Sequence, residues 1–91
     1  MIPKRIERLP WREVDGRAVV LDPRSGQVHE LNLVGTFLWQ NTDGKTSLES
    51  LSTLVLENFE VDPAEASSDV QDFFSTLASH GLVHWATSET A

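Results

Sequence analysis

The side chains whose types suit catalysis or metal binding are three histidines and a larger set of carboxylates. His80 and His84 are four residues apart, which would place two metal ligands on one face of a helix, but Gly81 favours a helix end between them. Neither these nor His29 is accompanied by Asp or Glu at ligand spacing, and no nucleophile or phosphate-binding motif is present. We therefore expect no metal site, no cofactor and no catalytic residue, so the protein is not expected to be an enzyme.

The composition is typical of one small globular domain. Ninety-one residues suffice for one modest core, and 40% apolar with 23% charged residues is the balance of a folded, soluble chain. The absence of cysteine excludes disulfides, a thiolate zinc site and a thiol nucleophile. No apolar run approaches the roughly 18 residues of a membrane span, and no signal segment is recognisable. We expect a single domain over residues 1–91, with its core in about residues 9–85, located in the cytoplasm and without a membrane partner.

The net charge of −7 argues against nucleic acid as a partner. Affinity for a phosphate backbone comes mainly from Lys and Arg, and the chain has seven of these against fourteen acidic residues. An acidic surface would suit a basic partner, although a solvated acidic face is the commoner reason for such a composition.

The first third of the chain has the pattern of an antiparallel β-meander. Asp15-Gly16 is a strong hairpin signal, because both central residues of a type I′ turn need positive φ. A second turn is expected at Asp22–Gly26, and residues 1–10 are expected to be an extended lead-in. The three strands are expected at Trp11–Asp15, Arg17–Asp22 and Gln27–Leu31. The third strand is then an edge, with Glu30 as a charged guard against unwanted pairing.

Three helices are expected to follow. The first runs from Leu33 to Asn41 with Asn32 as its N-cap, and the second runs from a capping box at Thr46–Glu49, with Thr46 as the cap, to Asn58. The third begins after a second capping box at Asp62–Glu65 and ends at Gly81. Leu82–Trp85 should be a short apolar strand or a packed extension, and residues 86–91 a frayed tail. The sequence thus predicts an α+β fold similar to a winged helix-turn-helix, with a three-stranded antiparallel β-meander followed by three α-helices.

The aromatic residues are expected to serve mainly the core. Trp11, Trp39 and Trp85 are expected in the core or at its rim. Phe73 and Phe74 are adjacent on the third helix, and neighbours on a helix point about 100° apart. Either one of them packs inward while the other forms a groove beside the open strand edge, or both are buried under a wide apolar stripe.

A winged-helix outline does not imply DNA binding here. The third helix would be the recognition helix, and it contains no Lys or Arg. Its acidic residues, Glu65, Asp69 and Asp72, would be repelled by a major groove.

Several segments resemble the PqqD family, named for the pyrroloquinoline quinone synthesis protein D. The resemblance covers roughly residues 9–85 and is strongest at L-N-x-x-G-x-x-x-W over Leu31–Trp39, at Asp43-Gly44 and at Gly81-Leu82-Val83. Similar small domains are the recognition elements of ribosomally synthesised and post-translationally modified peptide (RiPP) pathways. The resemblance implies a non-catalytic adaptor that binds the leader segment of a precursor peptide. It also implies a modifying enzyme as a second partner, such as a radical S-adenosylmethionine protein, a cyclase or a leader peptidase.

The resemblance further implies that the leader adds a strand to the third strand and lies against the third helix, by β-augmentation. This agrees with the open edge expected from the residues themselves. The candidate peptide-binding residues are Val28, His29, Glu30, Leu31, Val70, Phe73, Phe74 and Leu77.

Two further expectations concern other partners. The alternative function is a winged-helix regulatory or general protein-interaction module outside peptide maturation. Without a peptide, the free edge is expected to allow a homodimer, because exposed strand edges can pair with a second copy.

Overall fold

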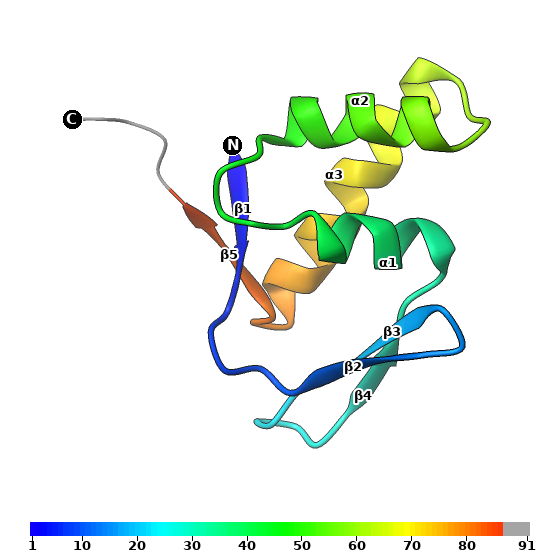
Figure 1. Cartoon of the computed structure of the whole chain (residues 1–91). Coiled ribbons are helices and arrows are strands. Elements are labelled where there is room, and N and C mark those ends of the chain that lie inside the picture. Colours follow the sequence, from blue (N-terminus) through cyan, green and yellow to red (C-terminus); the bar gives the residue numbers. More distant parts are fainter. Residues whose placement is uncertain (87–91) are drawn as a thin grey trace.

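A three-stranded antiparallel sheet and three helices make up most of the molecule (Figure 1). The computed structural model describes residues 1–86. The sheet has the order β2-β3-β4, with strands at Trp11–Val14, Arg17–Leu21 and Val28–Glu30. Helices α1, α2 and α3 follow at Leu33–Gln40, Leu48–Asn58 and Pro63–Ser79. The predicted α+β fold is confirmed. Of the tail expected over residues 86–91, Ala86 instead ends the last strand, and residues 87–91 lie outside the described residues.

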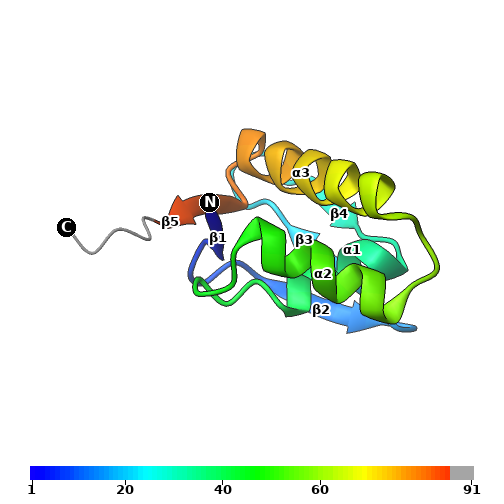
Figure 2. The same ribbon diagram turned by 90° about the horizontal axis from the view of Figure 1, so that it is seen from above.

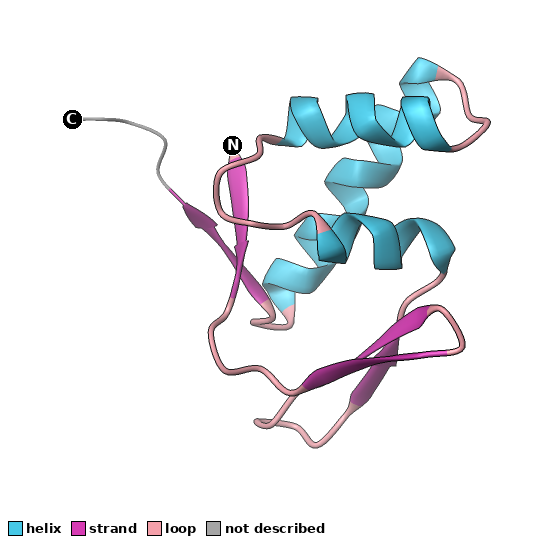
Figure 3. Ribbon diagram, viewed as in Figure 1, coloured by secondary structure: helices cyan, strands magenta, loops and turns pink. Residues whose placement is uncertain are grey.

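The first residues form a strand that the sequence did not predict. Residues 1–10 were expected to be only an extended lead-in, but β1, Ile2–Arg5, pairs antiparallel with β5, Val83–Ala86 (Figure 3). Of the two alternatives for Leu82–Trp85, the short strand is therefore the one present. The pairing joins two segments from opposite ends of the described chain, and neither segment carries a local signal that identifies its partner.

Local turn and cap signals account for most element boundaries. Asp15 and Gly16 have φ values of 54° and 81°, as the type I′ hairpin requires. The Asn32 side chain accepts the N–H of Gly35 at 2.7 Å, and the Asp62 side chain accepts the N–H of Glu65 at 2.8 Å. These contacts confirm the predicted N-caps of α1 and α3.

The predicted cap of α2 was wrong by one residue. Ser47 is the N-cap, and its hydroxyl accepts the N–H of Ser50 at 3.1 Å. Thr46 is instead held by Asp43, whose carboxylate accepts the Thr46 N–H at 2.9 Å and the Thr46 hydroxyl at 3.1 Å. The same carboxylate accepts the N–H of Lys45 at 2.8 Å, which is the main cause of a lowered Asp43 pKa. Thr46 therefore belongs to the turn before the helix.

The core lies between the inner face of the sheet and the three helices. On β3, Ala18 and Val20 are fully buried, and the Ala18 N–H donates to the hydroxyl of buried Thr36 on α1 at 2.8 Å. Trp39 is fully buried, whereas Trp11 is 38% exposed and meets the Trp39 ring edge-on at 6.0 Å. Tryptophans in the core and at its rim are thus confirmed, with Trp85 also partly buried. The helices contribute Leu38, Trp39, Leu51, Val55, Ala66, Val70, Phe74 and Leu77 to the core.

The three helices pack on one another and on the sheet. α2 and α3 pack along each other, while α1 packs against β3 (Figure 2).

Within residues 1–86, no helix has the length and apolar character needed to cross a membrane.

Candidate binding groove

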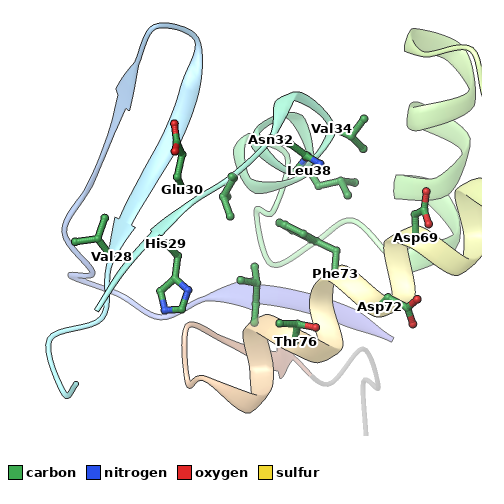
Figure 4. Close-up of a pocket in the computed structure, with 13 residues that line it drawn as sticks. Val28, His29, Glu30, Asn32, Val34, Leu38, Asp69, Asp72, Phe73 and Thr76 are labelled. Atoms are coloured by element: carbon green, nitrogen blue, oxygen red, sulfur yellow. The ribbon is translucent and has the colours of Figure 1, made fainter. Parts of the chain in front are cut away.

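A groove of about 710 Å³ lies between β4, the beginning of α1 and one face of α3 (Figure 4). One wall is the edge strand and the residues that connect it to α1. The other wall is a stripe of α3 whose members are three or four residues apart. The lining residues are Val28, His29, Glu30, Leu31, Asn32, Val34, Gly35, Leu38, Asp69, Asp72, Phe73, Thr76 and Leu77.

In the part of the chain that the structure describes, the strand that borders the groove has an unpaired edge. β4 pairs on one side with β3, and it is the last strand of its sheet. The Leu31 N–H donates to Ala18 O at 2.8 Å, and Gln27 O accepts from the Asp22 N–H at 2.8 Å, so Gln27, His29 and Leu31 direct their backbone groups towards β3. Because these directions alternate along a strand, the N–H and C=O groups of Val28 and Glu30 point outwards. An extended chain laid beside β4 can pair with those groups.

Phe73 and Phe74 occupy different environments. Phe73 is partly buried and lines the groove, whereas Phe74 is fully buried in the core. Their rings meet edge-on, with centroids 4.9 Å apart and an interplanar angle of 81°. Of the two alternatives left open by the sequence, the structure shows the one in which a single ring forms the groove.

Two of the residues proposed as peptide contacts lie elsewhere. Val70 and Phe74 are both fully buried, so neither side chain reaches the groove surface. They are four residues apart and therefore share the core-facing stripe of α3, about 60° (Val70) to 100° (Phe74) round the helix from Phe73. The other six candidates do line the groove, and they are Val28, His29, Glu30, Leu31, Phe73 and Leu77.

Gly35 leaves room for the Phe73 ring to pack against the first turn of α1. A Cβ atom at position 35 would lie 3.0 Å from Phe73 Cε1 and 3.1 Å from Asn32 Oδ1. Glycine thus removes the atom that would hold the aromatic ring away from the helix backbone. The sequence motif L-N-x-x-G-x-x-x-W contains this glycine, but its role depends on a ring that is 38 positions later in the chain.

One end of the groove is tied together by contacts between the sheet and α3. The rings of His29 and His80 lie 4.9 Å apart with an angle of 57° between their planes, and His29 Nε2 is buried without a hydrogen-bond partner in the described structure. Arg24, in the turn before β4, donates from Nη2 to the carbonyl oxygen of His80 at 3.1 Å. A Cβ atom at Gly81 would overlap the Arg24 guanidinium. The glycine at the end of α3 therefore leaves room for this link.

Asp22 shapes the turn that carries Arg24. Its carboxylate accepts the Arg24 N–H at 3.0 Å, and this bond is the main reason why the Asp22 pKa lies below its usual value. The Gly26 N–H donates to the Asp22 carbonyl oxygen at 2.8 Å within the same turn. The turn thus sets the place of the arginine before β4 begins.

The features of this groove suit the binding of an extended chain. Among residues 1–86, no three His, Asp or Glu side chains are grouped so that they could hold a metal ion. The groove offers an outward backbone edge, an aromatic ring and apolar side chains, with acidic groups at its margin. The sequence did not single out Asn32, Val34, Leu38 and Thr76 as lining residues. The i, i+3, i+4, i+7 spacing of Asp69, Asp72, Phe73 and Thr76 would have indicated a shared helix face.

The sequence family agrees with this architecture. Residues 17–83 match the family model of coenzyme PQQ synthesis protein D (PqqD). The chain belongs to the PqqD family. The match includes β3, β4 and all three helices, so it covers the strand edge and both walls of the groove.

Known structures share the PqqD-family fold seen here. TbiB1 in complex with the TbiA(beta) leader peptide aligns with a TM-score of 0.79 and 22% identity, covering 89% of this chain and 94% of that one. Lasso peptide synthetase B1, complexed with its leader peptide, aligns with a TM-score of 0.80 and 20% identity over 92% and 99% of the two chains.

A third similar structure is the PqqD truncation of PqqCD from Methylobacterium extorquens, described as a functional and stand-alone RiPP recognition element. It aligns with a TM-score of 0.74 and 16% identity over 91% of this chain and 88% of that one. Comparison with curated proteins gives no match. At these identities the structural likenesses establish the fold of the chain.

Proposed function

We propose that this PqqD-family chain is a non-catalytic adaptor that binds the leader segment of a ribosomally synthesised precursor peptide. The observation that carries the proposal is the unpaired edge of β4 beside a groove that contains Phe73. An edge without a groove would accept any extended chain, because all peptides share the same backbone. The groove adds the side-chain contacts that selectivity needs.

The leader adds a fourth strand to the sheet in this proposal. Its main chain pairs with the outward groups of Val28 and Glu30, and alternate side chains descend towards α3. An apolar side chain of the leader rests on Phe73, between Leu31 and Leu77. Two similar structures contain leader peptides, which supports this class of occupant.

The bound precursor is then presented to a second protein. A modifying enzyme such as a radical S-adenosylmethionine protein or a cyclase, or a leader peptidase, remains the predicted partner. The chain is predicted to act in the cytoplasm as one domain over residues 1–91.

A second copy of the chain competes with the peptide for the same edge. Among the described residues, β4 has no partner on its outer side, so two copies can pair edge to edge when peptide is absent. We therefore predict a weak homodimer that the peptide dissociates.

Selection from a displayed library of random peptides tests the proposed function without knowledge of the natural precursor. The chain should enrich a set of related peptides, and titration calorimetry with synthetic copies should show saturable binding. Duplex DNA should not bind at physiological salt, given the net charge of −7. Failure to enrich any peptide family, together with micromolar DNA binding, would favour the regulatory alternative.

A further inference from the structure

The charged side chains that line the groove are all acidic. They are Asp69 and Asp72 on α3, and the lining contains no Lys or Arg. Glu30 borders the groove with its backbone, because its side chain alternates with those of His29 and Leu31 and points to the outer face of the sheet. We infer, on the basis of the proposed function, that the leader carries a Lys or Arg about two residues from the apolar side chain that packs on Phe73. The unpaired strand edge and the groove define the site, and the carboxylates define which peptide fits it.

The two aspartates are placed to meet such a side chain. All four residues Asp69, Asp72, Phe73 and Thr76 lie on one stripe of α3, and the close-up shows both carboxylates on this wall (Figure 4). Asp69 precedes Phe73 by four residues, which is about 6 Å along the helix axis. Two residues of an added strand span about 6.6 Å and point their side chains to the same face. A peptide side chain two positions from the apolar anchor therefore lies level with Asp69, the carboxylate farther along the helix from Phe73.

Within residues 1–86, these carboxylates have no cationic partner. Neither α1 nor α3 contains Lys or Arg, and the side-chain hydrogen bonds made within residues 1–86 leave out Glu30, Asp69 and Asp72. Both aspartates are exposed. Solvated acidic residues are common on helices, but here they stand at the margin of a groove and have no basic neighbour at i±4 to neutralise them. A Lys or Arg side chain of the bound peptide would supply the missing positive charge.

The expected gain is modest and depends on salt. Exposed ion pairs are screened, so we expect a Lys or Arg to raise affinity about two- to fivefold over Gln at low salt. An arginine that bonds a carboxylate through two N–H groups should lie at the upper end of this range. The gain should shrink as the ionic strength rises and the Debye length falls.

The test compares peptide selection by three forms of the chain. The first is the parent, the second is Asp69→Asn with Asp72→Asn, and the third is a matched control, Glu57→Gln with Glu60→Gln. Glu57 and Glu60 are exposed and lie outside the groove. Each double variant therefore loses two negative charges, but only the Asp69/Asp72 variant loses them in the groove. The control separates a contact in the groove from the general attraction of an acidic protein for cations.

The parent and the control should enrich Lys or Arg about two positions from an apolar residue. The Asp69/Asp72 double variant should keep the apolar preference and lose the basic one, and the retained preference shows that it is folded. In titrations of the parent, changing the selected Lys to Gln should lower affinity about two- to fivefold. The same change should have no effect with the Asp69/Asp72 variant.

Two outcomes would overturn the inference and differ from failure of the proposed function. One is enrichment of apolar peptides by the parent without any basic residue. The other is equal loss of the basic preference in both double variants, which would assign it to net charge alone. Enrichment of no peptide at all would instead contradict the proposed function itself.

Discussion

Phe73 lies so close to Gly35 that a Cβ atom at position 35 would be 3.0 Å from its Cε1 atom. The position of the Phe73 ring in the groove wall therefore depends on having a glycine, which has no side chain, in the first turn of α1. The Phe73 ring is only partly buried, so it has room to move towards the groove when it is displaced. The glycine thus governs the shape of the groove more than the stability of the core.

Gly35→Ala should weaken peptide binding while changing stability little. The added methyl group pushes Phe73 into the space that the peptide would occupy. Alanine favours the helix by about 0.5–1 kcal/mol, which offsets the crowding in the free protein. Chemical denaturation and calorimetric titration of the same variant check both effects. Unchanged peptide affinity would show that the Phe73 position is not set by Gly35.

The adjacent phenylalanines form a matched pair for truncation. Phe73→Ala should reduce peptide affinity by about 1–3 kcal/mol with a smaller loss of stability, as for an aromatic hot spot at an interface. Phe74→Ala should lower the free energy of unfolding by about 3–5 kcal/mol, because that ring is fully buried. Thermal melting and titration of both variants separate the two roles. A Phe73 variant that binds like the parent would remove this ring from the site.

Arg24→Ala should loosen the end of the groove where β4 approaches α3. The change removes the bond from Arg24 Nη2 to His80 O, which is 3.1 Å long and exposed. We expect a stability loss of at most about 1 kcal/mol, as for an exposed interaction. Amide exchange should become faster in β4 and at the end of α3, with α2 as an internal control. If the change in exchange rate between parent and variant is the same in β4, at the end of α3 and in α2, the arginine does not hold the groove together.

The stability of the fold should fall at acidic pH through Asp22 and Asp43. Backbone N–H groups of Arg24 and Lys45, respectively, lower the pKa values of these two carboxyls in the folded chain. The unfolded chain then takes up protons first, so the added stability is complete above the unfolded pKa of about 3.9 and is lost as pH falls through the folded values. Asp22→Asn and Asp43→Asn should flatten this part of the pH profile in urea denaturation. A parent profile with no decline below pH 4 would contradict the assignment.

Local chemistry made much of the fold predictable. The Asp15-Gly16 turn and the caps at Asn32 and Asp62 depend on neighbours within a few residues. The pairing of Ile2–Arg5 with Val83–Ala86 was not predictable in this way, because the two strands are separated by almost the whole chain.

The groove was predictable in outline, but not in its side chains. Six of the eight candidate residues line it, since an edge strand and a facing helix imply a shared surface. The sequence could not show which neighbour of the pair Phe73 and Phe74 faces inward, because that depends on how α3 is rotated against α2 and the sheet. Asp69 and Asp72 were considered only as groups that repel DNA, although the fold places both on the α3 wall of the groove.

The backbone edge of β4 can be tested apart from its side chains. Val28→Pro removes an outward N–H, which an edge strand tolerates, while Val28→Ala keeps that group and loses only the exposed side chain. The proline variant should therefore lose more peptide affinity than the alanine variant. Equal affinities in titration would count against strand pairing at this position.

Hydrogen exchange of individual amides, measured with and without a selected peptide, tests the proposed strand addition most directly. β2 supplies the control, because it forms the other edge of the same sheet and its register leaves the Glu13 N–H pointing outwards. The proposed pairing predicts new protection at Val28 and Glu30 and none at Glu13. Saturation with peptide that leaves the Val28 and Glu30 amides as exposed as before, or that protects Glu13 equally, would contradict it.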